Sequence, residues 1–229
     1  KFLISYNKIE AHLKSILGTD DYVPFVRSVE LIVKKNLSPI IKRYRDDLIE
    51  FAELRNAIVH KTIDPNHAIA EPHDYVVDAI CEIEKELLTP KKVIPMFARS
   101  VHTCEVTDLL SDLLKTIREK EYSQFPVYDR GKFKGLITRK GITKWLAKQV
   151  ETNNQLSVDV PLYDVLISES NRSNFEFISE DVSIYEAKDK FLTYLNFGKR
   201  LDTLLITATG KQDEPLLGMI TPLDLVVVP

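Results

Sequence analysis

The stretch Gly218-Met219-Ile220-Thr221-Pro222-Leu223-Asp224 decides the fold of this 229-residue chain, because a similar stretch stands earlier in the sequence. The earlier stretch is Gly135-Leu136-Ile137-Thr138-Arg139-Lys140-Gly141. A short apolar run precedes each of them, Gln124 to Asp129 in the first copy and Thr203 to Thr207 in the second. A unit that recurs in this way predicts two copies of one supersecondary structure.

Each copy also has an amphipathic helical pattern upstream, around Asp108 to Lys120 in the first and around Ser183 to Phe197 in the second. The predicted order in each unit is therefore strand, helix, strand, turn, strand and short helix. Two such units side by side bury each other's sheet faces, which predicts an α/β pair.

The second unit resembles the cystathionine-β-synthase (CBS) domain, on the residues Phe177-Ile178-Ser179-Glu180-Asp181-Val182-Ser183-Ile184-Tyr185-Glu186-Ala187 and on Gly218 to Asp224. The first unit is similar through Phe125-Pro126-Val127 and Gly135 to Thr138, with the weaker match of the two. This resemblance covers about Val93 to Val228 and implies a CBS pair. It implies a sensor that binds AMP, ADP, ATP or S-adenosylmethionine between the repeats, with Pro126, Val127 and Thr138 among the binding residues.

Thr221 and Asp224 are the strongest candidates for binding such a ligand. A threonine at a strand end and an aspartate three residues later lie on one side of the opening helical turn. Thr221 can donate to a phosphate oxygen, Asp224 can accept from the ribose hydroxyls, and Phe177 is an apolar neighbour for the adenine. The alternative is structural: Thr221 caps the helix and Asp224 complements its dipole.

The first unit departs from this pattern because Gly141, three residues after Thr138, supplies no carboxylate for a ribose. We therefore expect its half of the cleft to bind weakly or to be empty. In the second unit, Leu205-Ile206 stands where the family has Pro-Val.

The segment from Lys1 to about Leu88 contains one glycine, Gly18, and its apolar residues recur at helical spacing. The pattern predicts an all-helical domain with four helices. The first two run from about Phe2 to Leu17 and from Val23 to Leu37. The third begins at Ser38-Pro39, an N-cap followed by proline, and ends near His60. The fourth ends at Leu88.

Arg55, Asn56 and His60 lie near the end of the third predicted helix, and Arg-Asn-x-x-x-His there resembles the HEPN domains. Many members of that family are dimeric, metal-independent RNases. The resemblance implies that His60 is a general acid or base, that Arg55 stabilises charge on phosphorus and that Asn56 assists. The alternative is that Arg55 pairs with a nearby acid and His60 interacts with the helix C-terminus.

Composition excludes a strongly basic nucleic-acid or membrane binder, because 31 lysines and arginines against 34 aspartates and glutamates give a net charge of -3. Cys81 and Cys104 match no zinc spacing, which favours reduced thiols and predicts no metal site. No apolar run is long enough to span a membrane. We expect a cytoplasmic protein. Because the first residue is Lys1 and not methionine, whether the chain is a fragment of a longer protein stays open.

The fold class that follows is a multidomain α+β protein. The expected division is a HEPN-like helical domain over residues 1–88, a linker and first CBS repeat over 89–158, and a second repeat over 159–229. The leading hypothesis is a homodimeric regulatory protein whose CBS pair binds an adenine nucleotide or S-adenosyl ligand and modulates the helical domain. The alternatives are a nucleotide-gated RNase acting on RNA and a dimerisation scaffold, so whether the chain is an enzyme stays open.

Overall fold

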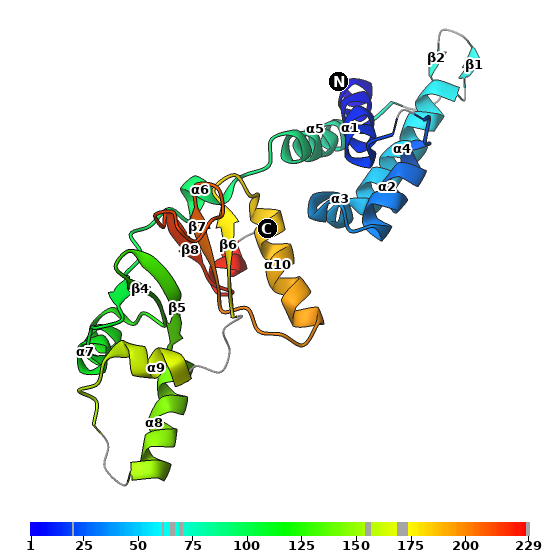
Figure 1. Cartoon of the computed structure of the whole chain (residues 1–229). Helices are drawn as coiled ribbons and strands as arrows, with labels where there is room; N and C mark the ends of the chain where they lie inside the picture. Colours follow the sequence, from blue (N-terminus) through cyan, green and yellow to red (C-terminus); the bar gives the residue numbers. More distant parts are fainter. Residues whose placement is uncertain are drawn as a thin grey trace. The chain divides into compact units, whose positions relative to one another are not determined.

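The computed structural model describes residues 1–19, 21–60, 62–64, 67–68, 71–153, 157–168 and 174–227. The chain separates into two compact units, one of Lys1–Lys91 with Ser183–Asp189 and one of Lys92–Val182 with Lys190–Pro229 (Figure 1). The finer three-part division at residues 88 and 158 stays a prediction.

The first unit is built mainly from helices around one apolar core. Its helices are α1 (Phe2–Leu17), α2 (Phe25–Lys34), α3 (Pro39–Arg43), α4 (Arg45–His60) and α5 (Asp74–Leu88). Helix α1 contacts α2, α4 and α5, and its fully buried Ile9 and Leu13 lie in the core. Gly18 ends α1 in the left-handed conformation, with φ of 60°. Ser38 caps α3 as predicted, because its Oγ accepts a hydrogen bond from the Ile41 amide at 3.3 Å.

Two features of this unit differ from the prediction. The long third helix is divided into α3 and α4 at Tyr44, whose hydroxyl donates to Glu86 of α5 at 2.6 Å. The strands β1 (Thr62–Asp64) and β2 (His67–Ala68) pair antiparallel between α4 and α5, so the prediction of an all-helical segment was wrong there. The β-branched Thr62 and Ile63 favour extended backbone, and the following proline cannot continue a helix.

The first turns of α10 (Ile184–Asn196) complete this unit although they lie far along the chain. Tyr185 is buried, and its hydroxyl donates to the same Glu86 oxygen as Tyr44, again at 2.6 Å. The Arg43 guanidinium lies 5.3 Å and 5.8 Å from the ring centres of Tyr44 and Tyr185.

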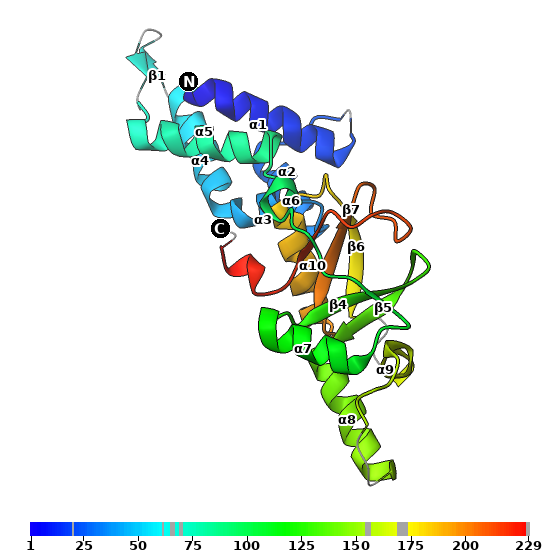
Figure 2. The ribbon, with the colours of Figure 1, turned by 90° about the vertical axis from the view of Figure 1, so that its left-hand side faces the viewer.

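The second unit contains two similar three-stranded sheets, whose strand orders are β3-β4-β5 and β6-β7-β8. Figure 2 shows β4 and β5 of the first sheet and β6 and β7 of the second. In each sheet the first pair of strands is parallel and the second pair is antiparallel. The predicted internal repeat is therefore present in the folded chain. The elements are α6 (Val93–Met96), β3 (Cys104–Glu105), α7 (Leu110–Lys120), β4 (Gln124–Asp129), β5 (Lys132–Thr138), α8 (Arg139–Asn153), α9 (Leu162–Ser168), β6 (Phe175–Ser179), α10, β7 (Thr203–Thr207), β8 (Gly218–Ile220) and the 3-10 helix η1 (Asp224–Val227).

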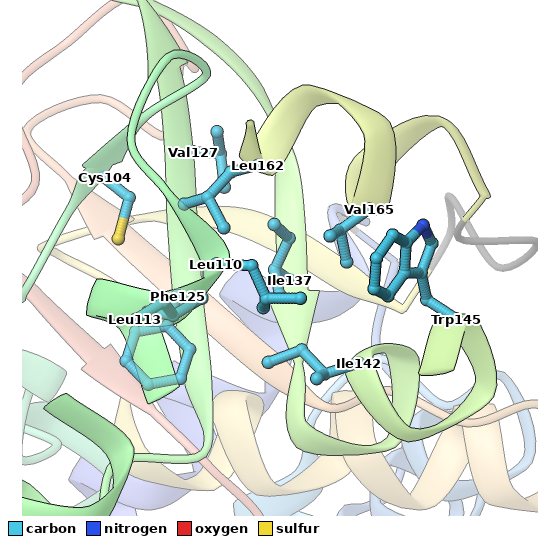
Figure 3. Packing of buried hydrophobic residues seen from close by; sticks show 10 residues of the cluster. All are labelled: Cys104, Leu110, Leu113, Phe125, Val127, Ile137, Ile142, Trp145, Leu162 and Val165. Carbon is cyan, nitrogen blue, oxygen red and sulfur yellow. The ribbon is translucent and has the colours of Figure 1, made fainter. Parts of the chain in front are cut away.

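The core of the first repeat lies between its sheet and the helices α7, α8 and α9 (Figure 3). Phe125, Val127 and Ile137 come from the strands, and Ile142 and Trp145 come from α8. The prediction of a short final helix was wrong here, because α8 has 15 residues. In the second repeat, the described residues end with η1.

The two repeats touch through aromatic rings. The Phe133 ring of β5 lies 5.0 Å from the rings of Phe175 and Phe177 of β6, edge to face in both pairs.

Packing explains why a glycine opens the second motif, since a side chain at Gly218 would collide with the Phe97 carbonyl.

Candidate functional site

Thr221 and Asp224 lie together at the end of β8. The backbone amide and the hydroxyl of Thr221 both donate to Asp224 Oδ2, each at 2.7 Å. This contact is the aspartate half of a capping arrangement, in which the third residue of a helix accepts from the capping residue. The spacing of threonine and aspartate therefore places their side chains in contact.

Arg99 completes the site and was missed by the sequence analysis. Its guanidinium donates to both oxygens of Asp224, at 3.3 Å to Oδ1 and 2.8 Å to Oδ2, and it also donates to the Met219 carbonyl. Arg99 follows α6 and is 125 residues from Asp224 in the sequence. No local spacing could have indicated this pair, because only the folded chain brings the two together.

The electrostatics of the site favour an ionised carboxylate. Burial opposes ionisation of Asp224, but the hydrogen bonds from Arg99 and Thr221 outweigh it and hold the pKa below its usual value. The side chains of Arg99 and Asp224 are 41% and 24% exposed. A carboxylate can accept from ligand hydroxyls, and the free edge of a guanidinium can pair with a phosphate.

Phe177 lies in the same sheet but not directly beside Thr221. It is paired in register with Leu205, which is paired with Met219. Two strand spacings put Phe177 about 10 Å from Met219. The Phe177 ring packs on Phe133 between the repeats, so it has a structural role whatever else it contacts.

The candidates in the first repeat are occupied in holding the fold. Thr138 is buried, and its hydroxyl oxygen accepts from the Gly141 amide at 3.0 Å at the start of α8. Val127 is fully buried in the core of Figure 3, and Pro126 is also buried in β4. These side chains offer little surface to a ligand, and the weak or empty half-site stays a prediction.

A recess begins one residue after Arg99. It has a volume of about 450 Å³ and is lined by Ser100 to Thr103 and by residues of α7 and the turn that follows it. The side chains of His102 and Tyr122 both line this recess, and their rings lie 6.2 Å apart with a 37° tilt. Such a pair can contact a planar base.

The candidate RNase residues lie at the end of α4. Arg55 donates to the Asn56 side-chain oxygen at 3.3 Å, and its guanidinium lies 5.9 Å from the centre of the Tyr6 ring. His60 is the last residue of α4, and its side chain lies outside the described part of the structure. The convergence of Arg55, Asn56 and His60 therefore stays a hypothesis.

Both cysteines are free. Among the described residues, no group of three or more histidine, cysteine or acidic side chains is arranged to hold a metal ion. In the same part of the chain, none of the helices has the length and apolar character needed to cross a membrane.

Comparison with known proteins identifies part of this architecture. The family model of the CBS domain matches residues 94–148, so the first repeat is a CBS domain. The match falls on the repeat whose motif is the weaker of the two by sequence. That repeat contains α8. The helical residues 1–88 lie outside the match.

Solved structures with CBS domains are similar to this chain at low identity. One is a signal-transduction protein from Burkholderia ambifaria, 19% identical, with a TM-score of 0.42 over 56% of this chain and 82% of that one. Another is a protein assigned to acetoin utilization from Vibrio cholerae, 19% identical, with a TM-score of 0.45 over 60% and 88%. A third is a CBS domain pair in complex with 5′-methylthioadenosine and S-adenosylmethionine, 17% identical, with a TM-score of 0.43 over 60% and 94%. The search of curated proteins found no match.

Proposed function

We propose that the chain is a ligand-sensing regulatory protein that binds one adenosine-containing ligand beside Asp224 and thereby modulates the helical unit. One observation carries this proposal: the carboxylate of Asp224 is held by Arg99 and Thr221 within the Gly-x-x-Thr-x-x-Asp motif of a CBS-like repeat. The ligand is AMP, ADP, ATP or S-adenosylmethionine.

Each residue has a role that follows from its chemistry. Asp224 accepts from the ribose hydroxyls through Oδ1, which has fewer partners than Oδ2. Arg99 pairs with the phosphate or carboxylate of the ligand. The recess that starts at Ser100 takes the base against the side chains of His102 and Tyr122.

Calorimetry with the four ligands tests the proposal. Asp224→Ala should weaken the ligand that binds by about 1.5–3 kcal/mol, the range for hydrogen bonds to a charged group. Asp213→Ala is the matched control, because Asp213 is exposed in the loop before β8. Unchanged affinity in Asp224→Ala would remove this residue from the site, and no binding by any of the four ligands would favour the scaffold hypothesis.

Arg99→Met separates the phosphate contact from the ribose contact. Since the guanidinium is the charged partner in the site, this variant should weaken AMP binding more than adenosine binding. Equal losses for AMP and adenosine would show that Arg99 only positions Asp224.

Modulation of the helical unit, homodimerisation and a cytoplasmic location are further parts of the same proposal. The described contacts of Arg55 and Asn56 do not favour RNA cleavage over sensing, so the RNase alternative stays a hypothesis. That alternative would be supported if the unchanged chain cleaved a structured RNA in the presence of a chelator and if His60→Ala abolished the cleavage.

A further inference from the structure

A cavity in the helical unit has no part in the proposed adenosine site. Its volume is about 290 Å³, and its walls come from α1, from the loop that joins α1 to α2 and from Ser28 of α2. Small-molecule sites commonly have volumes of about 300–1,000 Å³, so this cavity suits a ligand of few atoms. Leu17 and Val23 are the apolar part of its wall.

Three charged side chains line this cavity. Glu10 and Lys14 are four residues apart on α1, a spacing at which opposite charges commonly pair. Within the described part of the chain, however, the charged groups of Glu10, Lys14 and Asp21 form no ion pair or hydrogen bond. Two carboxylates against one ammonium leave the cavity lining with one net negative charge.

The hydroxyl of Tyr6 is a further polar group at this place. Tyr6 is only 4% exposed, and its ring stacks on that of Phe25 with the ring centres 4.3 Å apart. The hydroxyl makes no hydrogen bond to a described residue, although its oxygen keeps some contact with solvent. Burial raises the pKa of Tyr6, and the carboxylate of Glu10, one helical turn further along α1, raises it as well. The hydroxyl is therefore protonated at neutral pH and lies near the cavity wall that Glu10 forms.

The arrangement fits a molecule with two positive charges and one negative charge. The net negative lining repels a polyanion, and a simple cation would leave Lys14 without a partner. A ligand ammonium has three N–H donors, of which the Glu10 carboxylate and the Tyr6 hydroxyl oxygen can each accept one. Lys14 can pair with a ligand carboxylate, since it lies one turn beyond Glu10. A second cation can pair with Asp21 beside the Tyr22 ring, which is 84% exposed.

We propose that this cavity binds a free amino acid with a cationic side chain, such as arginine. The α-ammonium group binds to Glu10, the α-carboxylate to Lys14 and the side-chain cation to Asp21. The aliphatic part of the ligand contacts Leu17 and Val23. This proposal goes beyond ligand sensing by the two repeats and does not depend on adenosine binding there.

Calorimetry on the full chain with three matched probes tests this proposal. Agmatine is arginine without the carboxylate, and citrulline carries a neutral urea group in place of the guanidinium. Each of them should bind at least about tenfold more weakly than L-arginine, because each lacks one charged contact. No binding of L-arginine, or equal affinity for the three probes, would overturn the proposal.

Single substitutions assign each contact. Lys14→Met should weaken L-arginine about tenfold without weakening agmatine, and Asp21→Asn should weaken L-arginine by a similar factor without weakening citrulline. Glu10→Gln should weaken all three probes, because each of them keeps the primary amine. Lys35→Met is the matched control, since Lys35 is an exposed lysine of the same unit that does not line the cavity. Equal losses for L-arginine and agmatine in Lys14→Met would overturn the proposal.

Discussion

At the scale of single residues, Asp224 is the most heavily bonded side chain of the candidate site. One of its oxygens accepts from the Thr221 amide, the Thr221 hydroxyl and the Arg99 guanidinium. All three donors favour the ionised form, so the carboxylate stabilises the end of the second repeat in addition to any role in binding.

Asp224→Asn tests this contribution through its pH dependence. The pKa of Asp224 is lower in the folded chain than its usual value of 3.8, so its stabilisation is complete above that value and is lost as the pH falls through the folded pKa. In urea unfolding, the variant should be about 1–2 kcal/mol less stable from pH 7 to pH 5. The gap should narrow below about pH 4. A gap that stays constant at lower pH would contradict this assignment, and Asp213→Asn is the exposed control.

The sequence predicted half of this site. Spacing alone placed Thr221 and Asp224 together, because three residues make one turn at a helix start. Arg99 could not be found this way, since its partner lies 125 residues away.

At the scale of elements, α8 shows where local rules lose to tertiary packing. The repeat pattern predicted a short helix after β5, yet α8 continues to Asn153 although it contains Gly141, which has a low helix propensity. Ile142 and Trp145 are buried against the sheet in Figure 3, and this burial offsets the cost of a glycine in the first turn.

Trp145→Ala should therefore destabilise the second unit by about 3–5 kcal/mol, the usual loss for a large buried aromatic side chain. Unfolding in urea followed by circular dichroism measures this loss, since the variant has no tryptophan to report by fluorescence. Val150→Ala on the same helix is the control, because Val150 is 57% exposed and should change stability by less than about 0.5 kcal/mol. Similar losses in both variants would mean that α8 contributes through helix propensity rather than through the core.

At the scale of the whole molecule, large apolar side chains are exposed at the C-terminal end of α10 and directly after it. Leu195 and Phe197 are 70% and 76% exposed. Clusters of exposed apolar residues commonly mark contacts between proteins. A closed two-fold dimer is the commonest assembly of protein chains, and the homodimer stays a prediction for this one.

Light scattering at micromolar concentration should therefore give the mass of a dimer. Leu195→Glu should shift that mass toward the monomer, because a charge would be buried in the contact. Leu37→Glu is the control, since Leu37 is half exposed in the other unit. A monomer mass for the unchanged chain, with and without AMP, would reject the homodimer.

Tyr185 packs against the helices of the first unit, and this limits where the chain can be cut into separately folding parts. Its hydroxyl shares the Glu86 carboxylate with Tyr44, although it lies 99 residues beyond Glu86 in the chain. If the chain were divided at residues 89–92 and the helical part were produced alone, that part would lack Tyr185. The surface that this side chain covers would then be exposed to solvent. If recombination at that linker joined the helical part to a different repeat, Glu86 would face the residue that this repeat carries in place of Tyr185. The side chain at position 185 is therefore constrained by Glu86 of the helical part as well as by its own repeat.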